Sequence, residues 1–179
     1  CMQRVSHYRS GRVLHLHLRI PIDDKLCDLH VIAVYGVSSP MSSAAKRQLN
    51  ADVHQTVAAL LSTYSKHAVV VTGDINVASR DVDRHTGRQE QYDANRHALW
   101  RLLQSKGFVD CYVQAHPGRT DMTFKPNGKA VSRIDSTWAN EDMLRWPGAN
   151  GHPRSSICYV RTAAQLRPRA ACNTILWSV

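Results

Sequence analysis

Polar side chains follow two apolar segments of the chain, near the points where predicted strands end. Asp74 and Asn76 come directly after the apolar run 68–72, and Tyr35 lies near the end of segment 26–37. Polar residues directly after a buried strand commonly line the edge of a sheet where sites are built. A carboxylate there can hold a cation or accept hydrogen bonds, and an amide can donate them. An aspartate after a strand is also a common turn cap, and a lone tyrosine fits a core equally well.

The elements around these residues alternate between strands and helices. Three segments have the alternation or the apolar content of strands: 11–20, 26–37 and 68–72. Two segments repeat apolar residues at helical spacing: 42–65, capped by Ser42 or Ser43, and 93–105, ended by Gly107. Residues 108–113 predict a strand or loop. A hairpin is predicted from segments 122–124 and 132–139. A last strand is predicted over 156–160. This order predicts a layered α/β or α+β protein.

Composition narrows the possible partners. The 179 residues favour one domain and carry a net charge of +9 with a pI near 9.7. A basic surface attracts nucleic acid, acidic membranes or phosphorylated substrates, although a basic protein without a specific partner has the same composition. No apolar run is long enough for a membrane span. The five cysteines are widely spaced without a CxxC pair, which argues against a disulfide framework and a structural zinc site.

Four segments, in order, resemble the endonuclease/exonuclease/phosphatase superfamily. They are 31–36 (VIAVYG), 69–77 (VVVTGDINV), the stretch from GFVD at 107–110 to MTF at 122–124, and 132–138 (SRIDSTW). The continuation of GDIN to Asp83 is similar to the apurinic/apyrimidinic endonuclease branch, and endonuclease domains of non-LTR retrotransposons belong to the same superfamily. Four motifs in order and at sensible spacing are far more specific than GDxN alone.

The resemblance implies hydrolysis of a phosphate ester with Mg²⁺ or Mn²⁺, for which Asp74 and Asp135 are the candidate metal ligands. Asp74 would orient or deprotonate the attacking water, and Asn76 would donate a hydrogen bond to the phosphate. Tyr35 would contact the phosphate through its hydroxyl. Asp135 would hold the catalytic histidine or lie near the metal, whereas Arg133 would support its loop rather than touch substrate.

The carboxyl-terminal signature of the superfamily, S-D-H, has its best counterpart in Asn150-Gly151-His152, so His152 is the candidate catalytic histidine. Gly151 replaces the carboxylate that would orient this imidazole and raise its basicity. In the superfamily the metal-binding glutamate usually lies a strand or two before the position that corresponds to residue 1, and no glutamate precedes Glu90. We therefore expect an N-terminally truncated domain over residues 1–160, followed by a basic tail or linker over 161–179.

The expected fold is DNase I-like: part of a two-sheet β-sandwich flanked by helices. The expected function is a metal-dependent nuclease that cleaves DNA, from a retrotransposon-type polyprotein, in an intracellular and nuclear setting without a membrane partner. Two alternatives stay open: a phosphatase on phosphorylated lipid or sugar, and a decayed domain that only binds nucleic acid. The oligomeric state does not follow from the sequence.

Overall fold

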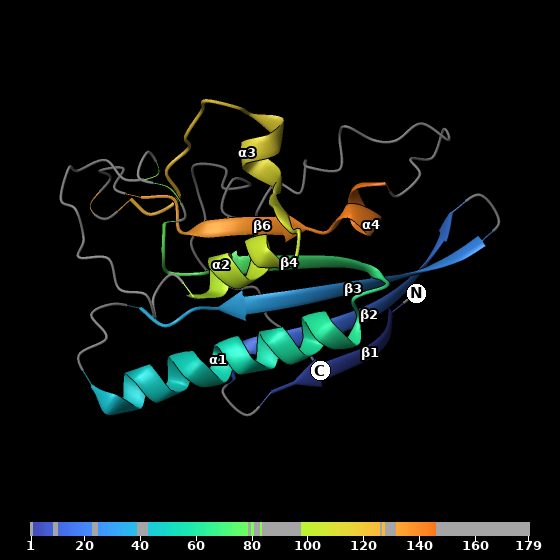
Figure 1. Ribbon diagram of the computed structural model, residues 1–179, viewed down its shortest axis with the longest axis horizontal. Coiled ribbons are helices and arrows are strands. Elements are labelled where there is room, and N and C mark those ends of the chain that lie inside the picture. The colour runs from blue at the N-terminus through green and yellow to red at the C-terminus, as the bar shows by residue number, and fades with distance from the viewer. Residues whose placement is uncertain are drawn as a thin grey trace.

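The computed structural model describes residues 2–8, 11–22, 25–38, 43–78, 80, 83, 98–125, 127 and 132–145. Within these residues the strands form one sheet in the order β1-β2-β3-β4-β6-β5 (Figure 1). The strands are β1 Met2–His7, β2 Val13–Ile22, β3 Lys25–Tyr35, β4 Ala68–Asp74, β5 Val109–Asp110 and β6 Asp135–Ala139. The helices are α1 Ala44–Thr63, α2 Ala98–Ser105, α3 Cys111–Ala115 and α4 Glu141–Leu144. No helix in these ranges is long and apolar enough to cross a membrane.

The central strands β2, β3 and β4 set the frame of the sheet. β2 and β3 form an antiparallel hairpin that pairs Val13 with Val34 and Ile22 with Lys25. β3 and β4 run parallel, which requires a crossover connection, and α1 provides it. Because β3 and β4 run parallel, they end at the same edge of the sheet, where Tyr35 is the partner of Asp74.

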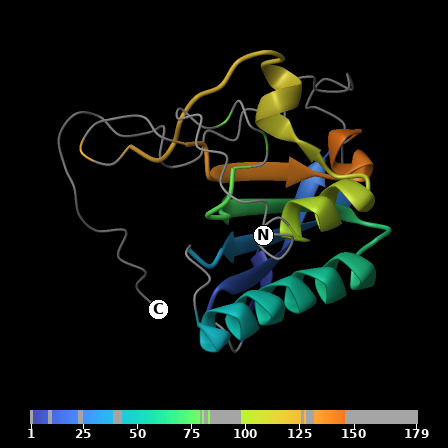
Figure 2. The same cartoon turned by 60° about the vertical axis from the view of Figure 1, so that its left-hand side comes forward.

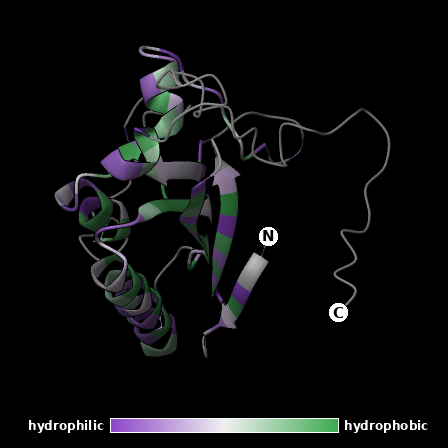
Figure 3. Cartoon of the chain, turned by 90° about the vertical axis from the view of Figure 1, so that its right-hand side faces the viewer, coloured by the Kyte–Doolittle hydropathy of each residue, from purple (hydrophilic) through white to green (hydrophobic). Residues whose placement is uncertain are grey.

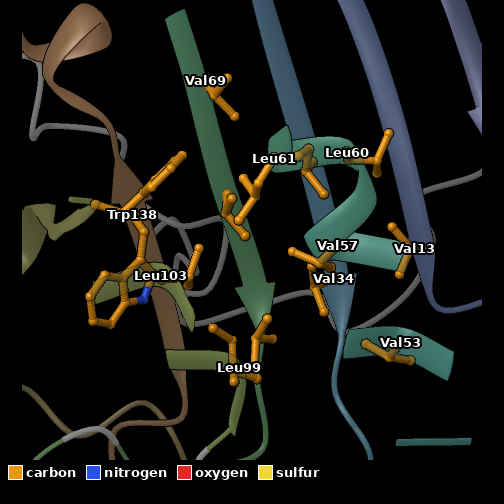
Figure 4. Close-up of a cluster of buried hydrophobic side chains, with 14 of the residues drawn as sticks. Val13, Val34, Val53, Val57, Leu60, Leu61, Val69, Leu99, Leu103 and Trp138 are labelled. Carbon is orange, nitrogen blue, oxygen red and sulfur yellow. The ribbon is translucent and has the colours of Figure 1, made fainter. Parts of the chain in front are cut away.

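Helices α1 and α2 cover one face of the sheet, as Figure 2 shows. Ser43 caps α1, and its hydroxyl accepts a hydrogen bond from the Lys46 amide at 3.2 Å. The main core lies between these helices and the strands and is drawn in Figure 4. Val57, Leu103 and Ile32 are fully buried in it. Complete burial of each such side chain contributes about 1.5–3 kcal/mol.

The opposite face of the sheet carries a smaller apolar cluster of Leu29, Ala68 and Val70. Only partly buried apolar residues pack against this cluster: Leu18, Ile20, Cys27, Val31 and Met143. Apolar and polar bands alternate along the strands in Figure 3 because successive side chains point to opposite faces. The mixed α/β class is confirmed, and the described residues form one sheet of the expected sandwich.

Two local predictions are only partly confirmed. Residues 108–113 hold only the short strand β5, and helix α3 begins at Cys111, because a carboxylate oxygen of Asp110 accepts hydrogen bonds from the next free amides, those of Tyr112 and Val113. Of the predicted hairpin, the residues that the structure describes show one antiparallel bridge, between Phe124 and Ser132. β6 pairs with β4 and β5 instead, so the partner of this strand comes from far along the chain.

Further predicted elements fall where the structure is not described. These are the start of the second helix (93–97), the last strand (156–160) and the tail (161–179). Strand β1 was not predicted, because its sequence MQRVSH lacks regular apolar alternation. It pairs with β2 all the same.

Candidate active site

Three of the predicted site residues lie side by side across neighbouring strands. Tyr35 is the register partner of Asp74 in the parallel β3–β4 pair, and Asp74 is the partner of Asp135 in the antiparallel β4–β6 pair. Paired residues point to the same face of a sheet, so the three side chains form one row on the face away from α1. Tyr35 and Asp74 close their strands and Asp135 opens β6, which places the row at one sheet edge.

Two glycines allow the ends of β3 and β4 to meet closely. Gly73 has a φ of +139°, and a β-carbon added there would lie 2.0 Å from the carbonyl oxygen of Val34. A β-carbon at Gly36 would lie 2.1 Å from the carbonyl oxygen of Ile75. The amide of Gly36 donates to the carbonyl of Asp74 at 2.7 Å. The glycine in GDIN is therefore required by the close approach of two backbones.

The residues after Asp74 form a tight turn that orients Asn76. Oδ1 of Asp74 accepts a hydrogen bond from the Asn76 amide at 2.8 Å, so the capping role considered for Asp74 is real and uses one carboxylate oxygen. Asn76 has a φ of +58°, a left-handed conformation that asparagine tolerates better than most residues. Its Nδ2 donates to the carbonyl of Gly36 at 3.0 Å. The side-chain amide is thereby fixed beside the end of β3.

The electrostatic setting of Asp74 suits a base. Partial burial raises its pKa above the ordinary value, and the neighbouring charge of Asp135 raises it further, while the hydrogen bond from the Asn76 amide opposes both. Asp135 is fixed by its backbone, because Oγ1 of Thr123 lies 3.1 Å from the amides of both Ile134 and Asp135. Two carboxylates are thus held at adjacent positions of one row.

Arg133 is buried in an ion network and supports the loop that leads to Asp135. Its side chain is 3% exposed and donates to both carboxylate oxygens of Asp83, at 3.2 and 3.1 Å, and to Asp110 at 2.6 Å. Burial alone would raise the pKa of Asp83, but hydrogen bonds from Arg80, Arg133 and Thr120 hold it well below the ordinary value. This ion network anchors the segment that leads into Asp135.

Two large aromatic side chains, Tyr35 and Phe124, are exposed. Tyr35 is 53% exposed, which favours the site over the core interpretation. Phe124 is 45% exposed and directly follows Thr123, the residue that binds the Asp135 amide. Its signal in the sequence was the MTF motif at 122–124. Tyr35 thus belongs to the carboxylate row, and Phe124 follows the residue that binds the Asp135 amide.

The catalytic histidine and the metal site are the two remaining expectations. His152 lies outside the described residues, so its relation to Asp135 stays a prediction. Among the residues that the structure does describe, no group of three or more histidine, cysteine, aspartate or glutamate side chains is arranged to hold a metal. Asp74 and Asp135 are therefore a pair of carboxylates rather than a complete coordination sphere.

Several solved structures are similar to this chain in fold. No family sequence model and no curated protein matches the chain. The 3′ phosphatase NExo from Neisseria, solved with a product DNA hairpin, is similar in structure, with a TM-score of 0.60 and 20% identity over 80% of this chain and 60% of NExo. An AP endonuclease from Archaeoglobus fulgidus is similar with a TM-score of 0.61 and 17% identity over 78% of this chain and 59% of that enzyme.

The catalytic domain of APE2 from Xenopus laevis gives a TM-score of 0.57 and 20% identity over 74% of this chain and 46% of that domain. The chain spans about three fifths of the length of the first two proteins. The described sheet and helices, together with these similarities, show that the chain has a DNase I-like fold.

Proposed function

We propose that this chain is the phosphodiesterase part of a nuclease that hydrolyses DNA with Mg²⁺ or Mn²⁺. The observation that carries the proposal is the convergence of Tyr35, Asp74, Asn76 and Asp135 on one sheet edge from three strands and a turn. The net charge of +9 suits a polyanionic substrate. Two of the similar proteins support DNA as substrate class: one was solved with a DNA hairpin and the other is an AP endonuclease.

The row residues Asp74 and Tyr35 and the neighbouring Asn76 have different roles in the proposed hydrolysis. Asp74 is the base, because its raised pKa gives the carboxylate a greater affinity for the proton of the attacking water. Asn76 uses one amide hydrogen on the Gly36 carbonyl, which orients the group so that its second hydrogen can be donated to a phosphate oxygen. A neutral amide suits that position, since a carboxylate would repel the phosphate. The exposed hydroxyl of Tyr35 adds a second donor.

The carboxylate pair fits a divalent cation of the Mg²⁺ type. Mg²⁺ is commonly held by one or two carboxylates together with water and substrate phosphates, so Asp74 and Asp135 would hold it here. Their mutual repulsion raises the pKa of Asp74, and a cation would offset that repulsion. When bound, the ion would neutralise charge on the phosphate and on the leaving oxygen.

The test is nicking of supercoiled plasmid with Mg²⁺ or Mn²⁺, with EDTA as the metal-free control. Asp74→Asn should abolish nicking, because the amide keeps the shape of the side chain and removes its basicity. Asp52→Asn, on the exposed face of α1, is the matched control and should nick like the wild type. Plasmid binding without nicking in either metal would contradict the proposal and favour a domain that only binds nucleic acid.

A second substrate belongs in the same experiment. NExo is described as a 3′ phosphatase, so an oligonucleotide with a 3′ phosphate tests release of inorganic phosphate beside strand cleavage. Phosphate release without nicking would favour a 3′ phosphatase on DNA over an endonuclease. A retrotransposon origin and nuclear localisation rest on the sequence resemblance and stay predictions.

A further inference from the structure

Arg12 extends the row of site residues onto a fourth strand. It directly precedes β2, and its carbonyl accepts a hydrogen bond from the Tyr35 amide at 2.8 Å. Its guanidinium lies over the ring of Tyr35, with Cζ 4.6 Å from the ring centroid. The order across the sheet is therefore Arg12, Tyr35, Asp74 and Asp135, with a cation at one end and two carboxylates at the other.

The guanidinium of Arg12 is hydrogen-bonded to the backbone that holds Asn76. Its Nη1 donates to the carbonyl of Gly36 at 2.9 Å and to the carbonyl of Tyr35 at 3.3 Å. The carbonyl of Gly36 also accepts the hydrogen bond from Nδ2 of Asn76. The Gly36 carbonyl thus joins the cation that precedes β2 to the Asn76 amide that we assign to the phosphate.

This junction has little freedom to rearrange. Gly36 is packed so tightly that an added β-carbon would strike Ile75, so its peptide cannot shift toward β4. Asn76 holds a left-handed backbone conformation that is costly for residues other than glycine, and its hydrogen bonds with Asp74 and Gly36 stabilise that conformation. Loss of Arg12 would remove the guanidinium donor from the Gly36 carbonyl, leaving the Asn76 amide to hold it, and would uncover one face of the Tyr35 ring.

We propose that Arg12 is a positioning residue that fixes the Asn76 amide through the Gly36 carbonyl and fixes the Tyr35 ring by stacking. The inference rests on the proposed function, since it assumes that Asn76 and Tyr35 bind the phosphate. Lysine cannot replace arginine in this role, because an ammonium lacks the planar fork that stacks on a ring while donating to a carbonyl. A direct ionic contact to DNA is the rival role for Arg12.

The kinetic test separates these two roles with Arg12→Met and Arg12→Lys. A positioning role lowers kcat by about 10-fold to 100-fold in both variants, with KM and the salt dependence of DNA binding nearly unchanged. A direct phosphate contact instead raises KM in Arg12→Met and reduces the salt slope by about one, while Arg12→Lys keeps most of the activity. That second pattern would overturn the proposal.

Coupling between the residues gives a stricter criterion. If Arg12 acts through Asn76, the loss in the Arg12→Met/Asn76→Ala double variant falls well short of the product of the two single losses. The matched control is Arg19→Met, which removes the same charge from the other half of β2, where Arg19 lies 3.1 Å from Asp28. This control should leave kcat unchanged.

A readout without catalysis separates failure of this proposal from failure of the proposed function. The side-chain amide signals of Asn76 in a ¹⁵N NMR spectrum can be assigned by their disappearance in Asn76→Ala. In Arg12→Met we expect these signals to shift and to exchange faster with water, whereas in Arg19→Met they stay in place. Unchanged Asn76 signals in Arg12→Met would refute the positioning role even if the protein cleaves no DNA.

Discussion

A buried imidazole pair should make the stability of this fold depend on pH between about 6.5 and 4. His15 and His30 are each 3% exposed, and Nε2 of His15 lies 3.0 Å from Nδ1 of His30. The ring of Tyr64 stacks on both imidazoles, His17 stacks on His30, and His67 meets His30 edge-on. Neither buried imidazole can take a proton without placing charge in this stack.

The magnitude follows from the pKa of His30. Burial and the neighbouring histidines His17, His15 and His67 lower it from 6.5 to about 4, and only Asp28 acts in the opposite direction. The unfolded chain therefore binds a proton that the folded chain rejects between these two values. Stability is complete above about pH 6.5 and is lost progressively down to about pH 4. Between pH 7.5 and 4.5 this single group costs about 2.5 kcal/mol, and His15 adds in the same direction.

The assay is urea unfolding at pH 7.5, 6.5, 5.5 and 4.5, with the free energy of unfolding extrapolated to water. In the His15→Leu/His30→Leu variant both partners of the buried hydrogen bond become apolar, so the variant should fold and the loss between pH 7.5 and 4.5 should shrink by at least the amount given for His30. His7→Gln, an exposed histidine on β1, is the control and should keep the wild-type profile. A wild-type stability that is flat over this range, or a double variant with an unchanged slope, would refute the reasoning.

Three further predictions concern the site and its support. In metal-free protein the Asp74 carboxyl should titrate above the ordinary aspartate pKa of 3.8 when followed by NMR, because burial and the charge of Asp135 raise its pKa; a value at or below 3.8 would contradict this. Arg133→Met should lower the urea-unfolding free energy by about 3–5 kcal/mol, because Asp83 and Asp110 lose a buried partner. Gly73→Ala should cost about 1–3 kcal/mol or more in the same assay, against near-zero for Ala59→Ser on the exposed face of α1.

Elements with strong local patterns were predictable. The alternation in 11–20 and the apolar run in 26–37 predicted β2 and β3 to within a few residues, and Ser43 caps α1 as expected. These features depend on near neighbours in the chain, so a sequence pattern can report them. Helix α3 is short, and its start depends on a single cap at Asp110, which a periodicity argument does not detect.

Residues of the site were predictable in kind but not in arrangement. Asp74, Asn76 and Asp135 stood in motifs, and Tyr35 ended an apolar strand. Asp83 was quoted within a motif without a role, although it is fully buried between Arg80 and Arg133. A buried charge is tolerated only where partners surround it, and the Arg133 partner lies 50 residues away. No local feature of the sequence indicates that Asp83 pairs with Arg133.

By itself, then, the sequence determined the types of side chain available for chemistry, the strands that carry them and the glycines that let backbones approach. The tertiary structure alone decided that Arg12, Tyr35, Asp74 and Asp135 share one row, because strand register depends on which edges pair in space. It also decided that β6 pairs with β4, from much earlier in the chain, as well as with β5. Local propensity acts over a few residues, whereas register and buried ion pairing arise only when distant segments exclude water together.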